Sequence, residues 1–168
     1  MSKAIQRYVR FVDAMNRRIG RAAMYLIFVM MAVLLYSSIS KTFFLPSLWT
    51  IEIAQFLMVA YFLVGGPYSL QLNSHVRMDL LYGTWSDRTK TWVDAFTILF
   101  LIFYLFWLLY GSISSTQYAI QYGERSYSAW RPYMWPIKTV MTIAIALMLL
   151  QAIATFFKHL AKLRGEDL

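Results

Sequence analysis

A histidine, an arginine and a carboxylate follow one another at two-residue spacing in the segment His75-Val76-Arg77-Met78-Asp79. Histidine and aspartate side chains can exchange protons, and an arginine can bind a carboxylate or a phosphate. In an extended segment His75, Arg77 and Asp79 would lie on one side of the chain. No nucleophile with a base beside it and no glycine-rich phosphate loop accompanies them. The segment therefore favours an ionic contact over catalysis, and we predict that the protein is not an enzyme.

Other chemistries lack the residues that they require. The chain has no cysteine, which excludes disulfides and thiolate metal sites. Its histidines are His75 and His159, and both lie outside the apolar runs, so a haem held by two histidines is not expected. Ionisable residues near those runs, such as Glu52, Asp94 and Lys138, stand at or just outside the boundaries. We therefore predict that the chain itself binds no cofactor and no metal ion.

The composition indicates a membrane protein. Hydrophobic residues make up 60% of the 168 residues and charged residues 14%, whereas a soluble domain has about 45–50% and about 25%. Four apolar runs each approach the roughly 20 residues with which a helix crosses about 30 Å of hydrocarbon. Backbone groups in lipid must pair within their own segment, so the runs must be helical. The runs cover residues 22–40, 51–70, 95–114 and 137–157. We predict an all-α membrane protein with a four-helix transmembrane domain over residues 22–157.

The basic residues predict the orientation of these spans. Of the 16 Lys and Arg, most lie before the first span, between the second and third spans, or after the fourth. The opposite flanks hold only Lys41, Arg125, Arg131 and Lys138. Because cytoplasmic loops carry the excess of Lys and Arg, we expect both termini in the cytoplasm. Residues 158–168 would then form a basic cytoplasmic tail. The net charge of +8 is explained by topology, and no nucleic-acid partner is expected.

Residues 1–21 show the pattern of an amphipathic helix. Apolar residues recur there at steps of three and four: Ile5, Tyr8, Val9, Val12, Met15 and Ile19. Basic residues occupy the opposite face. Such a helix is suited to the headgroup layer of an anionic membrane, and we predict an N-terminal interfacial helix. A solvated cytoplasmic extension is the alternative.

Polar and small residues beside or within the spans indicate contacts with protein. Glu52 and Gln55 share a helix face at the entry to the second span, and polar groups in membranes usually face protein. A hydrated Glu52 at the helix N-terminus is the alternative. Gly65 and Gly66 permit close approach of another helix. Gln151, in a face of small and polar residues, is predicted to be buried against another helix.

The segment from Gly123 to Pro136, between the last two spans, is rich in Tyr and Trp. Rings of this kind commonly anchor a protein at the membrane interface, which is the first interpretation. Glu124, Arg125 and Arg131 lie among the rings, and they favour a second interpretation, a docking surface for an extracytoplasmic protein.

A set of motifs in a fixed order resembles one transporter family. Trp49 and Glu52 open the second span, a glycine lies near its end, the His75–Asp79 segment follows, and Pro136 precedes the last span. Over about residues 20–160 the chain resembles the small membrane subunit, or small permease, of tripartite ATP-independent periplasmic (TRAP) transporters.

The resemblance implies a sodium-driven symporter for organic acids, mainly carboxylates. In this family a periplasmic solute-binding protein delivers the substrate and a large membrane subunit, coupled to sodium, carries it. The small subunit is implied to be a scaffold in the bacterial inner membrane that braces the large subunit and helps to dock the binding protein. For contact with the large subunit or with membrane phospholipid we predict Trp49, Glu52, Gln55, Gly65, Gly66, His75, Arg77, Asp79 and Gln151. For docking of the binding protein we predict Glu124, Arg125 and Arg131.

Two other functions stay open at this point. A small, autonomous, proton-coupled transporter would use Glu52 as its protonatable group. The membrane anchor of a redox complex is the other, and a haem absorbance spectrum would distinguish it.

Overall fold

The computed structural model of the protein describes residues 3–72 and 86–163. These ranges contain α1 (Lys3–Met24), α2 (Leu26–Phe43), α3 (Thr50–Gln71), α5 (Asp87–Gln121) and α6 (Trp135–Leu163). Four stretches are long and apolar enough to cross a membrane, and they are Lys3–Phe43, Thr50–Gln71, Thr89–Gln121 and Trp135–Leu163. The predicted all-α fold with four spans is therefore confirmed, and the chain is a multi-pass membrane protein.

The helices are longer than the apolar runs. The third run was predicted at residues 95–114, yet α5 has 35 residues, which at about 1.5 Å per residue gives roughly 52 Å. Its start is fixed by Ser86, whose Oγ accepts a hydrogen bond from the backbone N–H of Thr89 at 3.4 Å. Because the hydrocarbon is only about 30 Å thick, α5 extends beyond it.

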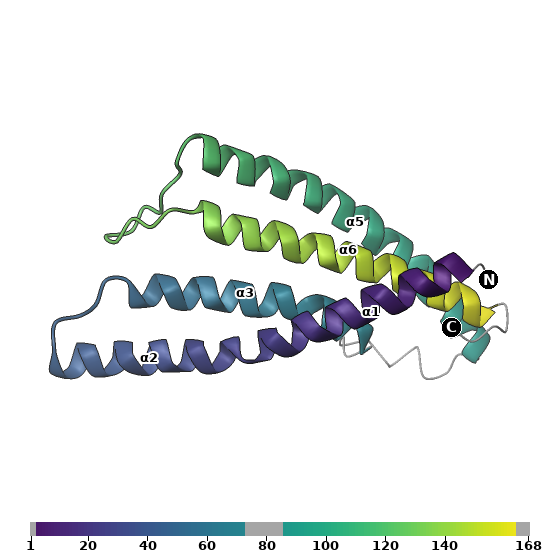
Figure 1. Ribbon diagram of the computed structural model, residues 1–168, viewed down its shortest axis with the longest axis horizontal. Coiled ribbons are helices and arrows are strands. Elements are labelled where there is room, and N and C mark those ends of the chain that lie inside the picture. The colour runs from purple at the N-terminus through teal and green to yellow at the C-terminus, as the bar shows by residue number, and fades with distance from the viewer. Residues whose placement is uncertain (1–2, 73–85, 164–168) are drawn as a thin grey trace.

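The N-terminal helix leads directly into the first span. Tyr25 separates α1 from α2, with backbone angles (φ −72°, ψ −17°) that are still helical. In Figure 1, α1 runs on from α2 at an angle and crosses over α3 and α6. The predicted boundary between residues 21 and 22 therefore falls inside a helix.

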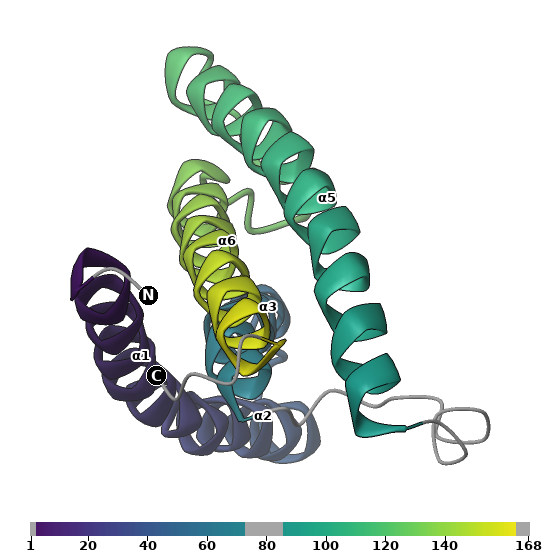
Figure 2. The same cartoon turned by 90° about the vertical axis from the view of Figure 1, so that its right-hand side faces the viewer.

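Helix α6 is the centre of the bundle. It packs against α5, α3 and α1, while α2 packs against α3 and α1. Figure 2 shows α6 between α1 and α5. The α2–α3 and α5–α6 pairs diverge at one end and converge at the other, where α1 crosses them (Figure 1). Buried alanines such as Ala144, Ala152 and Ala154 line α6, and small residues of this kind let membrane helices approach closely.

The outer faces of α2 and α5 are apolar and exposed. On α5 the exposed aromatic side chains include Phe96, Phe100, Phe103, Phe106, Trp107 and Tyr110. A contiguous apolar surface of this kind marks contact with a membrane or with another protein.

The beginning of α1 and the end of α6 lie at the same end of the bundle (Figure 1). That end's position in the cytoplasm stays a prediction.

Candidate interface sites

A polar network joins α1 to α6. Asn16 Nδ2 donates to Gln151 Oε1 at 2.7 Å, and Gln151 Nε2 donates to Asp13 Oδ1 at 3.0 Å. The other oxygen of Asp13 pairs with Lys158 Nζ at 2.6 Å. Gln151 is 0% exposed and Asn16 is 1% exposed. The predicted burial of Gln151 against another helix is confirmed, and its predicted contact with a large subunit or lipid stays a prediction.

Apolar contacts support this network. Val9 and Val12 are buried with Ala154 of α6, and the hydroxyl of Tyr8 donates to the backbone oxygen of Leu150 at 3.1 Å. Part of the apolar stripe of α1 is thus covered by protein. The placement of this helix in the headgroup layer stays a prediction.

Helices α1 and α3 come closest at Gly20. A Cβ added to Gly20 would lie 2.4 Å from Cβ and 2.6 Å from Cγ of Tyr68. Real Cβ atoms essentially never approach other atoms so closely, so only glycine permits this crossing. The predicted glycines behave differently. A Cβ on Gly65 would meet no described atom within 4 Å, and one on Gly66 would lie 3.5 Å from Met148 Sδ, an ordinary contact.

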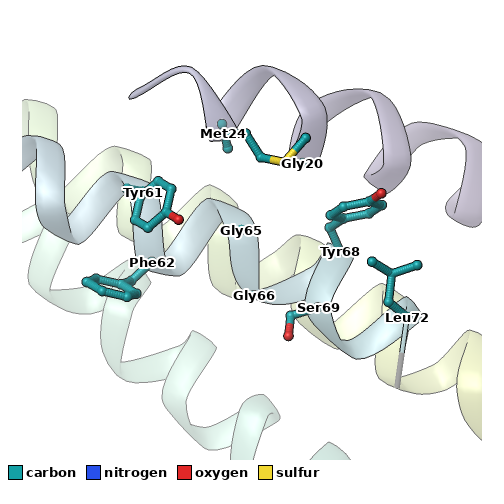
Figure 3. Close-up of a pocket in the computed structure, with 10 residues that line it drawn as sticks. Gly20, Met24, Tyr61, Phe62, Gly65, Gly66, Tyr68, Ser69 and Leu72 are labelled. Atoms are coloured by element: carbon teal, nitrogen blue, oxygen red, sulfur yellow. The ribbon is translucent and has the colours of Figure 1, made fainter. Parts of the chain in front are cut away.

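Gly20, Gly65 and Gly66 line a groove between α1 and α3. Figure 3 shows Gly20 and Met24 of α1 on one side, with Gly65 and Gly66 on α3 opposite them. The groove has a volume of about 460 Å³, and Tyr61 also lines it. Gly65 therefore lies on an open surface, which suits its predicted contact with a large subunit or lipid; that contact stays a prediction.

Hydroxyl groups fix the turn between α2 and α3. The Thr50 hydroxyl, 0% exposed, donates to Ser37 Oγ at 3.0 Å and shares a 3.0 Å hydrogen bond with Ser47 Oγ. Trp49 stacks on Tyr36 with ring centroids 5.7 Å apart. The predicted interface residue Trp49 thus has a partner within the chain, while 36% of its surface stays exposed.

Glu52 is buried at the same end of α3. It is 7% exposed, and neither of its carboxylate oxygens has a hydrogen-bond partner in the part of the chain that the structure describes. This burial favours a Glu52 side chain that is covered by protein over the hydrated alternative, and the predicted contact of Glu52 with a large subunit or lipid stays a prediction. Gln55, one turn further along, is exposed and lines a separate groove between α2 and α3.

The segment between α5 and α6 folds back on itself. The backbone N–H of Met134 donates to Glu124 O, and that of Ser126 donates to Pro132 O, both at 2.9 Å. Glu124 forms an ion pair with Lys138 at the start of α6. Gly123 has φ +58°, the left-handed conformation that glycine adopts readily. The predicted docking residues Glu124 and Arg125 therefore have partners within the chain: Glu124 pairs with Lys138, and the backbone of Arg125 pairs with that of Tyr133.

The three predicted docking residues differ in their availability. Glu124 is engaged by Lys138, and the Arg125 guanidinium lies 4.2 Å from the centre of the Tyr133 ring. Arg131 is exposed, and its backbone N–H, not its side chain, is held by Ser128 Oγ at 3.2 Å. Arg125 is exposed as well, but of the three only the Arg131 side chain has no partner among the described residues.

The segment from His75 to Asp79 lies outside the described residues. His75, Arg77 and Asp79 belong to residues 73–85, so their predicted contacts stay predictions. Within residues 3–72 and 86–163, no group of three or more His, Cys, Asp or Glu side chains could hold a metal ion.

Sequence reasoning missed Asp13, Asn16, Gly20 and Lys158. A signal for two of them was present, since Val9, Val12, Asn16, Gly20 and Ala23 are buried at three- and four-residue steps along α1. A polar residue and a glycine that continue an apolar stripe indicate a helix contact and a helix crossing.

Comparison with models of known protein families identifies a match. The model of the family described as tripartite ATP-independent periplasmic transporters, DctQ component, matches residues 30–162. A search of curated protein sequences gave no match.

Proposed function

The chain belongs to the DctQ family of tripartite ATP-independent periplasmic transporter components, and on this premise we propose that it is a non-catalytic scaffold. It would brace the large membrane subunit of a sodium-driven transporter for organic acids, chiefly carboxylates. It would also help to dock the periplasmic binding protein. Its place would be the bacterial inner membrane, with both termini in the cytoplasm.

The observation that carries this proposal is the apolar interior of the spans. From Ile53 to Gln71, from Ala95 to Gln121 and from Thr139 to Phe157 the sequence has no Asp, Glu, Lys, Arg or His. Carriers and pumps place such groups at membrane depth to bind ions and protons. A chain without them is suited to support a carrier, with the coupling-ion and substrate sites in the large subunit.

The polar side chains inside the bundle have a structural use. Thr142 of α6 shares hydrogen bonds with Ser112 Oγ at 2.6 Å and with Thr116 Oγ1 at 2.9 Å, both on α5. Hydrogen bonds of this kind between membrane helices contribute about 0.6–2 kcal/mol. They hold α5 on α6 and leave the aromatic face of α5 open. We propose that this face contacts the large subunit or the surrounding lipid.

A second candidate function is favoured by Glu52 alone. A buried carboxylate without a partner among the described residues is the kind of group that an autonomous, proton-coupled transporter would use. The two candidates predict different effects on transport when the charge of Glu52 is removed: no effect for the scaffold, and a complete loss for the autonomous transporter.

The substitution Glu52→Gln is expected to leave transport by the assembled complex within about twofold, because glutamine keeps the size of the side chain and no step depends on its charge. Uptake of a carboxylate would be measured in proteoliposomes, once under a sodium gradient and once under a proton gradient. We compare uptake by three preparations: the chain alone, the large subunit with the binding protein, and all three proteins together. Uptake by this chain alone, abolished in the Glu52→Gln variant, would replace the scaffold proposal by the second candidate.

Docking of the binding protein is tested at Arg131. Reversing this exposed charge with Arg131→Glu is expected to lower uptake on the order of threefold to tenfold at limiting binding protein, because charges at the rim of an interface act mainly on the association rate. The loss should shrink at saturating binding protein and at high salt. The control, Lys162→Glu, makes the same charge change in the last turn of α6. Equal uptake by both variants at every concentration would favour the interpretation of the outer segment as an interfacial aromatic belt.

A further inference from the structure

A second groove runs along α2 and α3, apart from the one in Figure 3. Its walls come from one face of each helix: Met30, Leu34, Ser37, Ser38 and Lys41 on α2, and Ile51, Ala54, Gln55 and Met58 on α3. The groove has a volume of about 390 Å³. Small residues form its floor, since Ser37 and Ala54 are 5% and 7% exposed.

The groove is apolar at one end and cationic at the other. Leu34 and Met58 are about half exposed, at 48% and 46%, although each lines the groove. At the opposite end stands Lys41, in the last turn of α2. Lys41 is exposed, and no ion pair or hydrogen bond of its side chain is found in the described part of the chain. Ser38, one turn before Lys41, places an exposed hydroxyl beside this cation.

The length of the groove matches one leaflet. Met30 and Lys41 are eleven positions apart on α2, which corresponds to roughly 16 Å along a helix. Half of the hydrocarbon thickness is about 15 Å. A chain that starts beside Lys41 and ends beside Met30 would therefore reach from the headgroup level to about the middle of the bilayer.

We propose that this groove binds one phospholipid of the leaflet nearest Lys41. The ammonium group of Lys41 pairs with the lipid phosphate, and the Ser38 hydroxyl donates to the phosphate or to an ester oxygen. One acyl chain lies between Leu34 and Met58 over the floor formed by Ser37 and Ala54. A cation at the open end of a groove lined by apolar side chains complements an anionic head attached to an apolar tail. The proposal needs only the membrane spans, so it does not depend on the proposed transport role.

The test is photocrosslinking of a phospholipid in the complete transporter. The complex is reconstituted in nanodiscs of phosphatidylethanolamine and phosphatidylglycerol that contain a phosphatidylglycerol with a photoreactive group in its acyl chain. We expect labelling to concentrate on peptides that contain Met30, Leu34 and Met58. Lys41→Gln should reduce this labelling about fivefold, the effect of one basic residue near an anionic headgroup. The control Lys162→Gln, a substitution of an exposed lysine outside the groove, should leave it unchanged.

A second variant tests the apolar part of the groove between α2 and α3. Ala54→Leu fills the floor of the groove and should reduce the labelling even though Lys41 is present. Because Ala54→Leu also alters the packing of α2 on α3, Lys41→Gln, which changes an exposed side chain, is decisive. Labelling spread evenly over the exposed faces of α2 and α5, or unchanged by Lys41→Gln, would overturn the proposal. Labelling found in the isolated chain but lost in the complex would overturn it as well, since the groove would then be a contact between subunits.

Discussion

Replacing Gly20 with alanine is expected to destabilise the bundle by about 1–3 kcal/mol, the usual range for overpacking a close contact. The new Cβ would lie 2.4 Å from Cβ of Tyr68. Neither atom can rotate away, because a Cβ is fixed by its own backbone. Relief therefore requires that α1 and α3 move apart, and that movement strains the contacts of α1 with α6. The measurement is unfolding of the purified chain in mixed micelles with rising dodecyl sulfate, followed by circular dichroism and tryptophan fluorescence.

The matched control is Gly65→Ala. This glycine also lies in a helix that contributes to the groove of Figure 3, but its added Cβ would meet no described atom within 4 Å. Alanine is favoured over glycine inside a helix by about 0.5–1 kcal/mol, so this variant should be as stable as the parent chain or slightly more so. Equal destabilisation by the two substitutions would contradict the close crossing at Gly20. In a scaffold, loss of the crossing should also weaken assembly with the large subunit, which co-purification measures.

The spans could be predicted from sequence because lipid imposes a simple requirement. A helix must bury about 20 apolar residues to cross the hydrocarbon, and each of the four runs does so. The helix ends could not be predicted from hydropathy, although the residue type of Ser86 favours an N-cap for the helix that leads into the third span. Hydropathy indicates which residues contact lipid. A helix, however, continues as long as its backbone N–H and C=O groups are hydrogen-bonded. Helix α5 therefore starts at Asp87, behind the Ser86 cap, and not at the first apolar residue.

The contacts between helices were less predictable. Gln151 lay on a face of small and polar residues, and its burial could be expected from the cost of an unpaired amide in lipid. Its partner Asn16 is 135 positions away, in a segment that was predicted to face the headgroup layer. Only the path of α1 brings the two together. The same path decides that Gly20, and not Gly65, is the glycine at a helix crossing.

The second large effect is expected at the network between α1 and α6. Gln151→Leu removes the acceptor of Asn16 and the donor to Asp13. Asn16 is 1% exposed, so its amide would be left buried without this partner, which costs about 1–3 kcal/mol. We therefore expect a loss of stability in that range in the same dodecyl sulfate titration. Gln117→Leu, at an exposed glutamine of α5, is the control and should change the stability by less than about 0.5 kcal/mol.

A double-mutant cycle separates the hydrogen bond from the packing. If Asn16 and Gln151 stabilise the bundle by pairing with each other, then Asn16→Leu together with Gln151→Leu should cost less than the sum of the two single changes, because no amide is left unpaired. The expected coupling is on the order of 1–2 kcal/mol for residues in direct contact. The ion pair between Asp13 and Lys158 remains in every variant, so it cancels in the cycle. Strictly additive losses would mean that the two side chains act by shape alone, and the docking of α1 on α6 would then depend on Val9, Val12 and Ala154 rather than on the buried amides.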